Sequence, residues 1–206
     1  MVDSMTKTVD FIFDCASPNA YLVYRPLREL VLRKGAELNI IPCLLGGIFK
    51  ATNNQPPMVS NAGIENKSAY ERLEFVRFIK AHGLSKFQFN EHFPVNTLLA
   101  MRGAVHAKQT GELEPYIECM LHHMWEQPKK LDEKDIYVAA LDECGLNGNA
   151  YVVASQRDMV KAELINNTAT AVKRGAFGVP TFFVGDEMFF GKERLGQIEA
   201  LLEQPS

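Results

Sequence analysis

A serine followed by a proline stands where a buried strand gives way to a helix, and such a position can hold a negative charge. The period-two pattern of residues 9–14 predicts a mostly buried strand. Ser17 then fits a helix N-cap and Pro18 the first helical position. Free backbone N–H groups and the positive end of the helix dipole favour an anion there. No general base stands at a fitting spacing, so we expect Ser17 to stabilise an anion rather than to act as a nucleophile.

A second candidate segment, Gly178-Val179-Pro180-Thr181, lies near the other end of the chain, directly before a predicted strand. A proline at this position is a candidate for a cis peptide bond, although only about 5–6% of X–Pro bonds in folded proteins are cis. An ordinary trans proline at the start of a strand is the alternative. The segment alone leaves both open.

The cysteines are widely spaced and form no C-x-x-C motif; they are Cys15, Cys43, Cys119 and Cys144. For a protein of a reducing compartment this pattern predicts small buried residues rather than disulfides. Cys15 stands two residues before Ser17 and could lie near the site, but packing at the strand end is favoured.

Other polar residues give weaker signals. His122 and His123 are adjacent on a predicted helix and point in different directions, which makes them poor joint ligands. The other histidines are scattered, so we predict no metal site. Lys50 is either a contact for an acidic substrate or a solvated lysine.

The composition is that of an ordinary soluble globular protein. The chain has 206 residues, 47% of them apolar and 23% charged, and a formal net charge of −3. No basic excess indicates nucleic-acid binding, and no long uncharged apolar run indicates a membrane span. Because the first residues lack the apolar core of a secretory signal, we expect a cytoplasmic protein.

The remaining elements are predicted from periodicity and turn signals. A second strand spans Glu37–Pro42, and the segment from Leu44 to about Asn147 is almost entirely helical. The helices expected there and just beyond are Lys67–Ala81, one capped by Asn96, Leu113–Trp125, one from Asp132 to Leu141, Asn149–Gln156 and Asp158–Arg174. A hairpin of Thr181–Val184 and Glu187–Phe190, and a helix from Glu193 to Leu202, complete the chain.

This order predicts an α/β protein with a thioredoxin-like fold, in which an all-helical domain is inserted after the first βαβ unit. The thioredoxin-like domain would comprise residues 1–44 and 157–206, and the helical insertion residues 45–156. A glutathione-transferase layout, with its helical domain at the end, fits less well because two strands follow the helices.

Five segments together resemble the 2-hydroxychromene-2-carboxylate isomerases and their relatives, the kappa-class glutathione transferases, in the disulfide-oxidoreductase branch of the thioredoxin superfamily. They are FDCASPNAYL (13–22), LLGGIFKATNNQPP (44–57), KSAY (67–70), FPVNTLLAMRG (93–103) and AFGVPTFFVGDEMFFGKERL (176–195). They span the chain in the family's order, and their combination is specific where any one piece is not.

The resemblance implies glutathione as cofactor and a set of residues that hold it. Ser17 would hydrogen-bond the glutathione sulfur, and Val179, before a cis Pro180, would pair with the glutathione backbone by strand addition. The further glutathione-binding residues that it implies are Asn54, Lys67, Phe190, Gly191, Lys192 and Glu193. Lys50 is a candidate substrate contact.

The activity implied is glutathione-dependent isomerisation between 2-hydroxychromene-2-carboxylate and trans-o-hydroxybenzylidenepyruvate, in aromatic catabolism, by a homodimer. One alternative is a kappa-like transferase acting on another electrophile, and another is a non-catalytic module that binds a peptide in the same groove. A dithiol oxidoreductase is opposed by Ser17 and Ala20, which stand where both redox cysteines should be.

Overall fold

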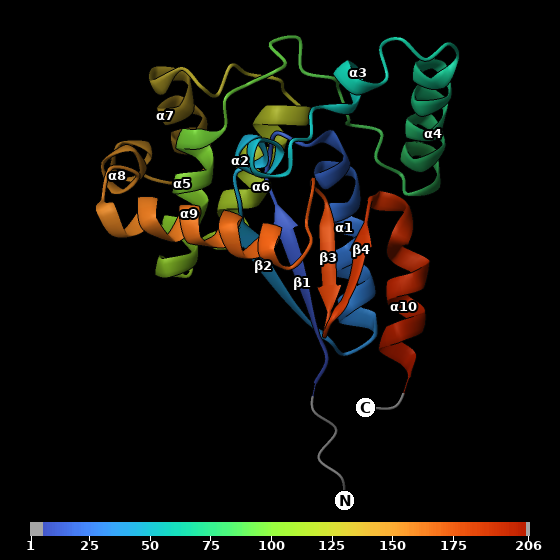
Figure 1. Ribbon diagram of the computed structural model, residues 1–206. Helices are drawn as coiled ribbons and strands as arrows, with labels where there is room; N and C mark the ends of the chain where they lie inside the picture. Colours follow the sequence, from blue (N-terminus) through green and yellow to red (C-terminus); the bar gives the residue numbers. More distant parts are fainter. Residues whose placement is uncertain (1–5, 205–206) are drawn as a thin grey trace, which may run out of the picture.

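The computed structural model describes residues 6–204 as a four-stranded sheet between helical layers (Figure 1). The chain first forms β1 (Thr8–Phe13), α1 (Pro18–Arg33) and β2 (Glu37–Pro42). A helical stretch follows, composed of α2 (Leu45–Thr52), α3 (Pro57–Ser60), α4 (Lys67–Ala81), α5 (Leu98–Thr110), α6 (Leu113–Trp125), α7 (Lys134–Glu143), α8 (Gly148–Ala154) and α9 (Asp158–Lys173). The chain ends with β3 (Thr181–Val184), β4 (Glu187–Phe190), the 3-10 turn η1 (Lys192–Arg194) and α10 (Leu195–Glu203).

The sheet has the order β2-β1-β3-β4, so the two halves of the chain meet at its centre. β1 pairs in parallel with β2 and antiparallel with β3, which forms a hairpin with β4. Phe11 lies opposite Phe182 in this register, and their rings stack 5.1 Å apart. The strand that precedes Ser17 therefore lies beside the strand that follows Pro180.

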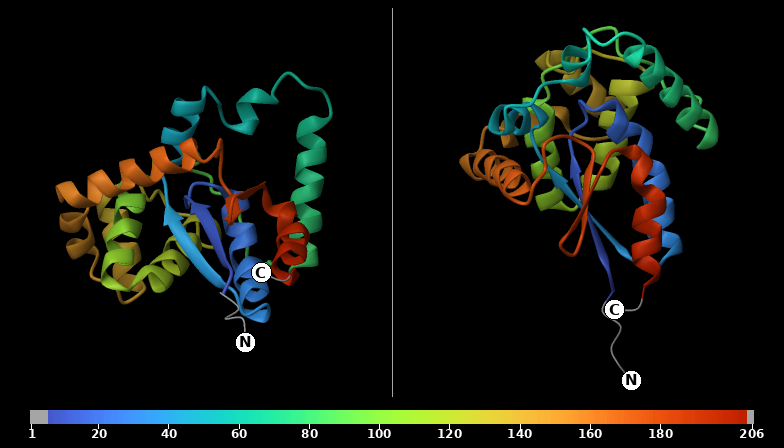
Figure 2. Two further views of the ribbon diagram at one scale, coloured as in Figure 1. Left: turned by 60° about the horizontal axis from the view of Figure 1, so that its bottom comes forward. Right: turned by 45° about the vertical axis from the view of Figure 1, so that its right-hand side comes forward.

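The two faces of the sheet are covered by different helices (Figure 2). α1 and α10 lie side by side on one face, where the ring of Phe13 on β1 packs against Tyr24 of α1. On the other face α9 crosses the sheet, and Arg174, which caps its end, binds Asp10 at 2.6 Å and lies over the ring of Phe183. The period-two pattern of β1 thus serves two buried faces, as expected for a central strand.

Most predicted elements are confirmed, and the differences lie at the ends of helices and of β1, which spans Thr8–Phe13 rather than residues 9–14. Both hairpin strands, β2, α4 and α6 have the predicted bounds. The N-cap of α5 is Thr97 rather than Asn96, although the Asn96 side chain still accepts from the N–H of Leu98 at 3.0 Å. α7 begins at Lys134, not Asp132, and the last helix is divided into η1 and α10. No helix within residues 6–204 is long and apolar enough to cross a membrane.

The prediction for the cysteines is wrong for two of the four. Cys119 on α6 and Cys144 at the end of α7 form a disulfide with a Cα–Cα distance of 6.0 Å, and Cys144 is exposed. They are 25 residues apart, and only the antiparallel packing of α6 and α7 brings them together. Cys15 and Cys43 are free and fully buried, as predicted.

Close packing around Gly103 gives a test of the helical region. A Cβ at this position in α5 would lie 2.2 Å from the Tyr116 hydroxyl and 2.3 Å from that of Tyr137. These hydroxyls are 2.8 Å apart, and that of Tyr116 donates to the carbonyl of Ala100. We expect Gly103→Ala to lower the free energy of unfolding by at least about 2 kcal/mol, because the rings cannot separate without breaking these bonds.

Gly196 in α10 is a matched control for this substitution. A Cβ there has no neighbour within 4 Å, so Gly196→Ala should raise the free energy of unfolding by up to about 1 kcal/mol through helix propensity. Urea unfolding of both variants measures the difference. Equal effects would contradict the packing described for Gly103.

Candidate functional site

The two halves of the predicted site meet directly. The Ser17 hydroxyl donates to the carbonyl oxygen of Val179 at 2.9 Å and accepts from the N–H of Ala20 at 3.3 Å. Ser17 is the N-cap of α1, with extended backbone, and Pro18 begins the helix. The residue is only 4% exposed. A hydroxyl is thus fixed at a helix N-terminus, where backbone N–H groups favour a negative charge.

The second half is built on the peptide bond between Val179 and Pro180, which is cis as the sequence suggested. Val179 is part of no strand, and within residues 6–204 its N–H makes no hydrogen bond. Among those residues, only the Ser17 hydroxyl donates to its carbonyl. The carbonyl of Pro180, by contrast, accepts from the N–H of Gly191. Within the described residues, Val179 therefore has an unpaired backbone donor and a carbonyl that is engaged by one side-chain hydroxyl.

Asp14, which the sequence analysis did not single out, organises the loop that carries Ser17. Its buried carboxylate accepts from the N–H of Ala16 at 2.9 Å, the N–H of Leu45 at 2.7 Å and the hydroxyl of Thr97 at 3.1 Å. Burial raises the pKa of Asp14, and the three hydrogen bonds oppose this shift. Asp14 thus joins the starts of α1, α2 and α5. Its bond to Ala16 follows a local pattern, because an Asp side chain can accept from the N–H two residues later.

Aromatic rings border the site at the end of β4. Phe190 is 39% exposed, and its ring centroid lies 4.4 Å from that of Phe177. A Cβ at Gly178 would come within 2.9 Å of the Phe190 ring, so glycine allows this close contact. The Asn54 side chain donates to the carbonyl of Phe177 at 2.8 Å. Asn54 and Phe190 are therefore both tied to the segment that leads to Val179.

Lys192 and Glu193 lie on η1, next to Gly191. Gly191 has φ +97, a conformation that favours glycine. Lys192 is only 4% exposed; it forms an ion pair with Glu193, and its ammonium lies 5.0 Å and 5.5 Å from the ring centroids of Phe75 and Phe78 on α4. Lys192 thus joins η1 to α4, which stands above α10 in Figure 1.

Lys50 and Lys67 are both exposed, in the last turn of α2 and at the first residue of α4. The structure forms a cavity of about 290 Å³ lined by Asn96, Leu98, Leu99, Arg102, Asp132 and Gln156, and another of about 360 Å³ beside Pro128 and Ile136. Neither includes Ser17 or Val179. The structure brings together Ser17, Val179 and Pro180, and the carboxamide of Asn54 reaches the same segment. Within residues 6–204, Lys50 and Lys67 make no hydrogen bond or ion pair with them.

A polar cluster on α1 and α6 fixes the helix that Ser17 begins. Glu126, 5% exposed, accepts from the Tyr21 hydroxyl at 2.9 Å, lies 2.9 Å from a ring nitrogen of His122 and pairs with Arg25 at 3.3 Å. Burial opposes ionisation, but the hydrogen bonds from His122 and Tyr21 and the charge of Arg25 outweigh it, so the pKa of Glu126 is lowered.

This cluster predicts a pH dependence of stability. A lowered folded-state pKa means that Glu126 stabilises the protein above its ordinary pKa of 4.5 and that the stabilisation is lost as pH falls through the folded value. At neutral pH, Glu126→Gln should lower the free energy of unfolding by about 1–2 kcal/mol, and this difference should shrink between about pH 5 and pH 3. Urea unfolding over that range measures it. A difference that does not change with pH would contradict the assignment.

Comparison with known proteins places this geometry in a family. Residues 8–203 match the family model described as DSBA-like thioredoxin domain. The chain belongs to this family. In this domain the sheet order is β2-β1-β3-β4, and the cis Val179–Pro180 bond faces the start of α1.

This chain is similar to known proteins over nearly its whole length. It is 24% identical over 200 residues to 2-hydroxychromene-2-carboxylate isomerase of Sphingobium xenophagum, covering 96% of this chain and 99% of the relative. It is 26% identical over 209 residues to glutathione S-transferase kappa 1 of Rattus norvegicus, covering 95% and 91%. The solved structure of a 2-hydroxychromene-2-carboxylate isomerase superposes with a TM-score of 0.80 at 24% identity, over 95% of this chain and 94% of that one. A structural similarity at 24% sequence identity shows that the two proteins share a fold.

Proposed function

We propose that this protein is a glutathione-dependent isomerase that interconverts 2-hydroxychromene-2-carboxylate and trans-o-hydroxybenzylidenepyruvate. The observation that carries the proposal is the contact between the Ser17 hydroxyl and the Val179 carbonyl at the start of α1. It is supported by isomerases and kappa-class transferases among the relatives. Bound glutathione would supply a thiolate that adds reversibly to the conjugated double bond of the substrate and so permits rotation about it.

Ser17 has the properties needed to stabilise this thiolate. A thiol with a pKa of about 8.5 is only ~3% ionised at pH 7, so useful activation requires a pKa lower by about 2 units, or ~2.7 kcal/mol. One hydrogen bond to a charged acceptor contributes ~1.5–3 kcal/mol and a helix N-terminus ~0.3–2 kcal/mol. The hydroxyl and the N-terminus of α1 can together meet this requirement.

Ligand binding would exchange one hydrogen bond for others. In the free protein the Ser17 hydroxyl donates to the Val179 carbonyl, and within residues 6–204 the Val179 N–H has no acceptor. An extended cysteinyl backbone can donate to that carbonyl and accept from that N–H, as an added strand does. The Ser17 hydroxyl is then free to turn toward the sulfur. The exchange couples recognition of the backbone to stabilisation of the thiolate.

The other residues proposed to hold glutathione are Asn54, Lys67, Phe190, Gly191, Lys192 and Glu193. Phe190 and Gly191 lie at the end of β4, and the Asn54 side chain donates to the carbonyl of Phe177, whose ring packs against that of Phe190. We propose that Lys192 acts by holding α4 and η1 together, because its ammonium is already engaged by Glu193 and two rings. We propose that Lys67, exposed at the start of α4, also contacts glutathione. Lys50, which is exposed as well, is proposed to bind the substrate carboxylate.

Three measurements test the function. With 2-hydroxychromene-2-carboxylate, catalytic glutathione should accelerate isomerisation, and no faster reaction than without glutathione would end the isomerase proposal. Faster turnover of 1-chloro-2,4-dinitrobenzene alone would favour a kappa-like transferase with the same thiolate site. Absence of saturable heat in a calorimetric titration with glutathione would favour a non-catalytic peptide-binding module.

Three further proposals concern organisation. We propose a homodimer, in which a second copy covers α4, because this helix has no buried residue and exposes Tyr70, Leu73 and Val76. Sedimentation tests this proposal: the wild type should be a dimer and Leu73→Glu a monomer, and a monomeric wild type would contradict it.

The domain boundaries at residues 44/45 and 156/157 and the cytoplasmic location stay predictions. Limited proteolysis tests the boundaries, and cell fractionation tests the location.

A further inference from the structure

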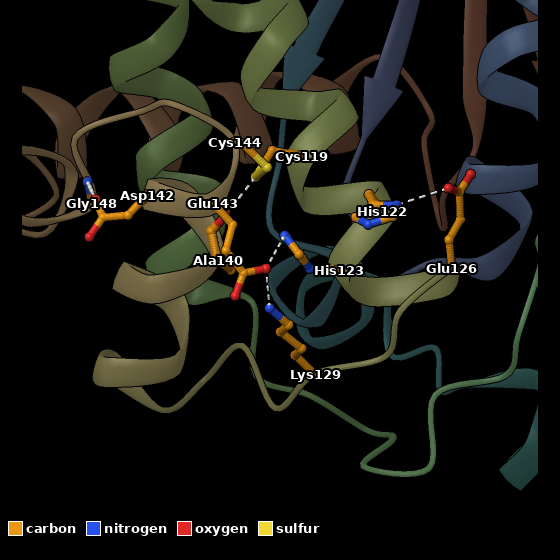
Figure 3. Close-up of a disulfide and its surroundings, with 10 residues drawn as sticks. All are labelled: Cys119, His122, His123, Glu126, Lys129, Ala140, Asp142, Glu143, Cys144 and Gly148. Carbon is orange, nitrogen blue, oxygen red and sulfur yellow. Dashed lines mark hydrogen bonds and ion pairs between the residues drawn. A yellow bond between two sulfur atoms is a disulfide. The ribbon is translucent and has the colours of Figure 1, made fainter.

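Outside this site, two cysteines and a histidine gather between α6 and α7. Cys119 and His123 are four residues apart on α6 and share one face of the helix, and Cys144 caps the end of α7. The two sulfur atoms and one ring nitrogen of His123 all lie within 4.8 Å of one another. Figure 3 shows the imidazole near the disulfide, with the carboxylate of Glu143 between His123 and the ammonium of Lys129.

His123 is the unusual member of this cluster. It is only 2% exposed, and neither ring nitrogen makes a hydrogen bond within residues 6–204. A buried polar group without a partner is costly, and an ion is one of the few explanations for it. Its neighbour His122 differs, because its ring turns toward Glu126 and hydrogen-bonds there (Figure 3). Of these two histidines, His123 is therefore the one with a ring nitrogen near the two sulfur atoms.

These donors fit one class of metal ion. Two thiolates and an imidazole are the ligands of zinc sites with Cys and His, which bind at about 2.3 Å to sulfur and 2.0–2.1 Å to nitrogen. A carboxylate oxygen of Glu143 lies 3.6 Å from Nε2 of His123, on the exposed side where a fourth ligand would enter. Cys119 is buried, while Cys144 is exposed.

We propose that Cys119, His123 and Cys144 bind a zinc-type divalent ion when the disulfide is reduced, with water or Glu143 as the fourth ligand. Reduction by a dithiol or a phosphine delivers two electrons, and the sulfurs take up two protons. Each thiol loses its proton to solvent when it binds the ion. Thiol–disulfide exchange with an oxidised dithiol, which takes up the two electrons as it is reduced, reforms the disulfide, removes both sulfur ligands and releases the ion. The disulfide is the metal-free form of the same site, and either form joins α6 to α7.

Cobalt titration tests this independently of glutathione. The full-length protein is reduced with a water-soluble phosphine, freed of it without air and titrated with Co²⁺. We expect one Co²⁺ per chain with thiolate-to-cobalt charge-transfer absorption, displaced by Zn²⁺. The oxidised protein, which needs no substitution, should show no such band. Absence of the band in the reduced protein, or its presence in the oxidised one, would overturn the proposal.

Matched variants assign the ligands. Cys144→Ser and His123→Gln should each weaken Co²⁺ binding roughly 100-fold, because each removes one of three protein ligands. His122→Gln changes the adjacent histidine, which faces Glu126, and should bind Co²⁺ as the wild type does. Unchanged binding in Cys144→Ser would mean that other thiols hold the ion, and the proposed site would be wrong. Because Cys144 lies at the surface, this variant should fold normally.

Discussion

Ser17→Ala should lower kcat/KM of the glutathione-dependent reaction about 10- to 100-fold at neutral pH, which corresponds to the ~1.5–3 kcal/mol of one hydrogen bond to a charged acceptor. Alanine cannot donate to the sulfur, whereas the backbone groups of Val179 that would hold the ligand remain. Glutathione affinity should therefore change only several-fold. Steady-state kinetics over a range of glutathione concentrations, together with calorimetry, separate the two effects.

Ser17→Thr is the matched control for this variant. Threonine keeps a hydroxyl and remains a good N-cap, so activity should stay well above that of Ser17→Ala. Both variants must be compared at a temperature where they are folded, because losing the bond to Ala20 costs about 1 kcal/mol of stability. If alanine and threonine variants have the same activity, the hydroxyl does not stabilise the thiolate.

Asp14→Ala should be among the most destabilising substitutions near the site. It leaves the N–H of Ala16, the N–H of Leu45 and the hydroxyl of Thr97 without their acceptor in a buried position. An unpaired buried donor costs about 1–3 kcal/mol, so the free energy of unfolding should fall by roughly 3 kcal/mol or more. Thermal and urea unfolding measure this loss.

Asp14→Asn provides the comparison for that substitution. Its single carbonyl oxygen can serve Leu45 and Thr97 or else Ala16, but its NH₂ group then faces a remaining donor, so an intermediate loss is expected. Because the loop between Asp14 and α1 positions Ser17, activity should fall in the folded fraction of both variants. A stable and fully active Asp14→Ala would show that the three hydrogen bonds do not position the loop.

Local features of the sequence predicted most of the secondary structure. β2, β3 and β4 have the predicted bounds because each is a short run flanked by turn residues. The N-cap role of Ser17 needed only the Ser-Pro pair after a buried strand. The proximity of Ser17 and Val179, 162 residues apart, could be expected only from the family resemblance, because no local pattern encodes it.

The missed features depend on tertiary packing. Cys119 and Cys144 form a disulfide only because α6 and α7 pack together, and their spacing gave no motif. The apolar stripe of α4 predicted a helix correctly, but Tyr70 and Val76 point to solvent rather than into a core. Lys192 is buried because α4 places two rings over it. The bond from Ala16 to Asp14 follows a local pattern, but the bonds from Leu45 and Thr97 join residues far apart in the sequence and could not be predicted from it.

The most direct test of the central claim is the pKa of the thiol of glutathione bound to the protein, measured by thiolate absorbance against pH. For the wild type we expect a value about 2 units below the ordinary 8.5 of a free thiol, and for Ser17→Ala a value higher by about 1–2 units. Identical titration curves for the two proteins would contradict the role assigned to Ser17.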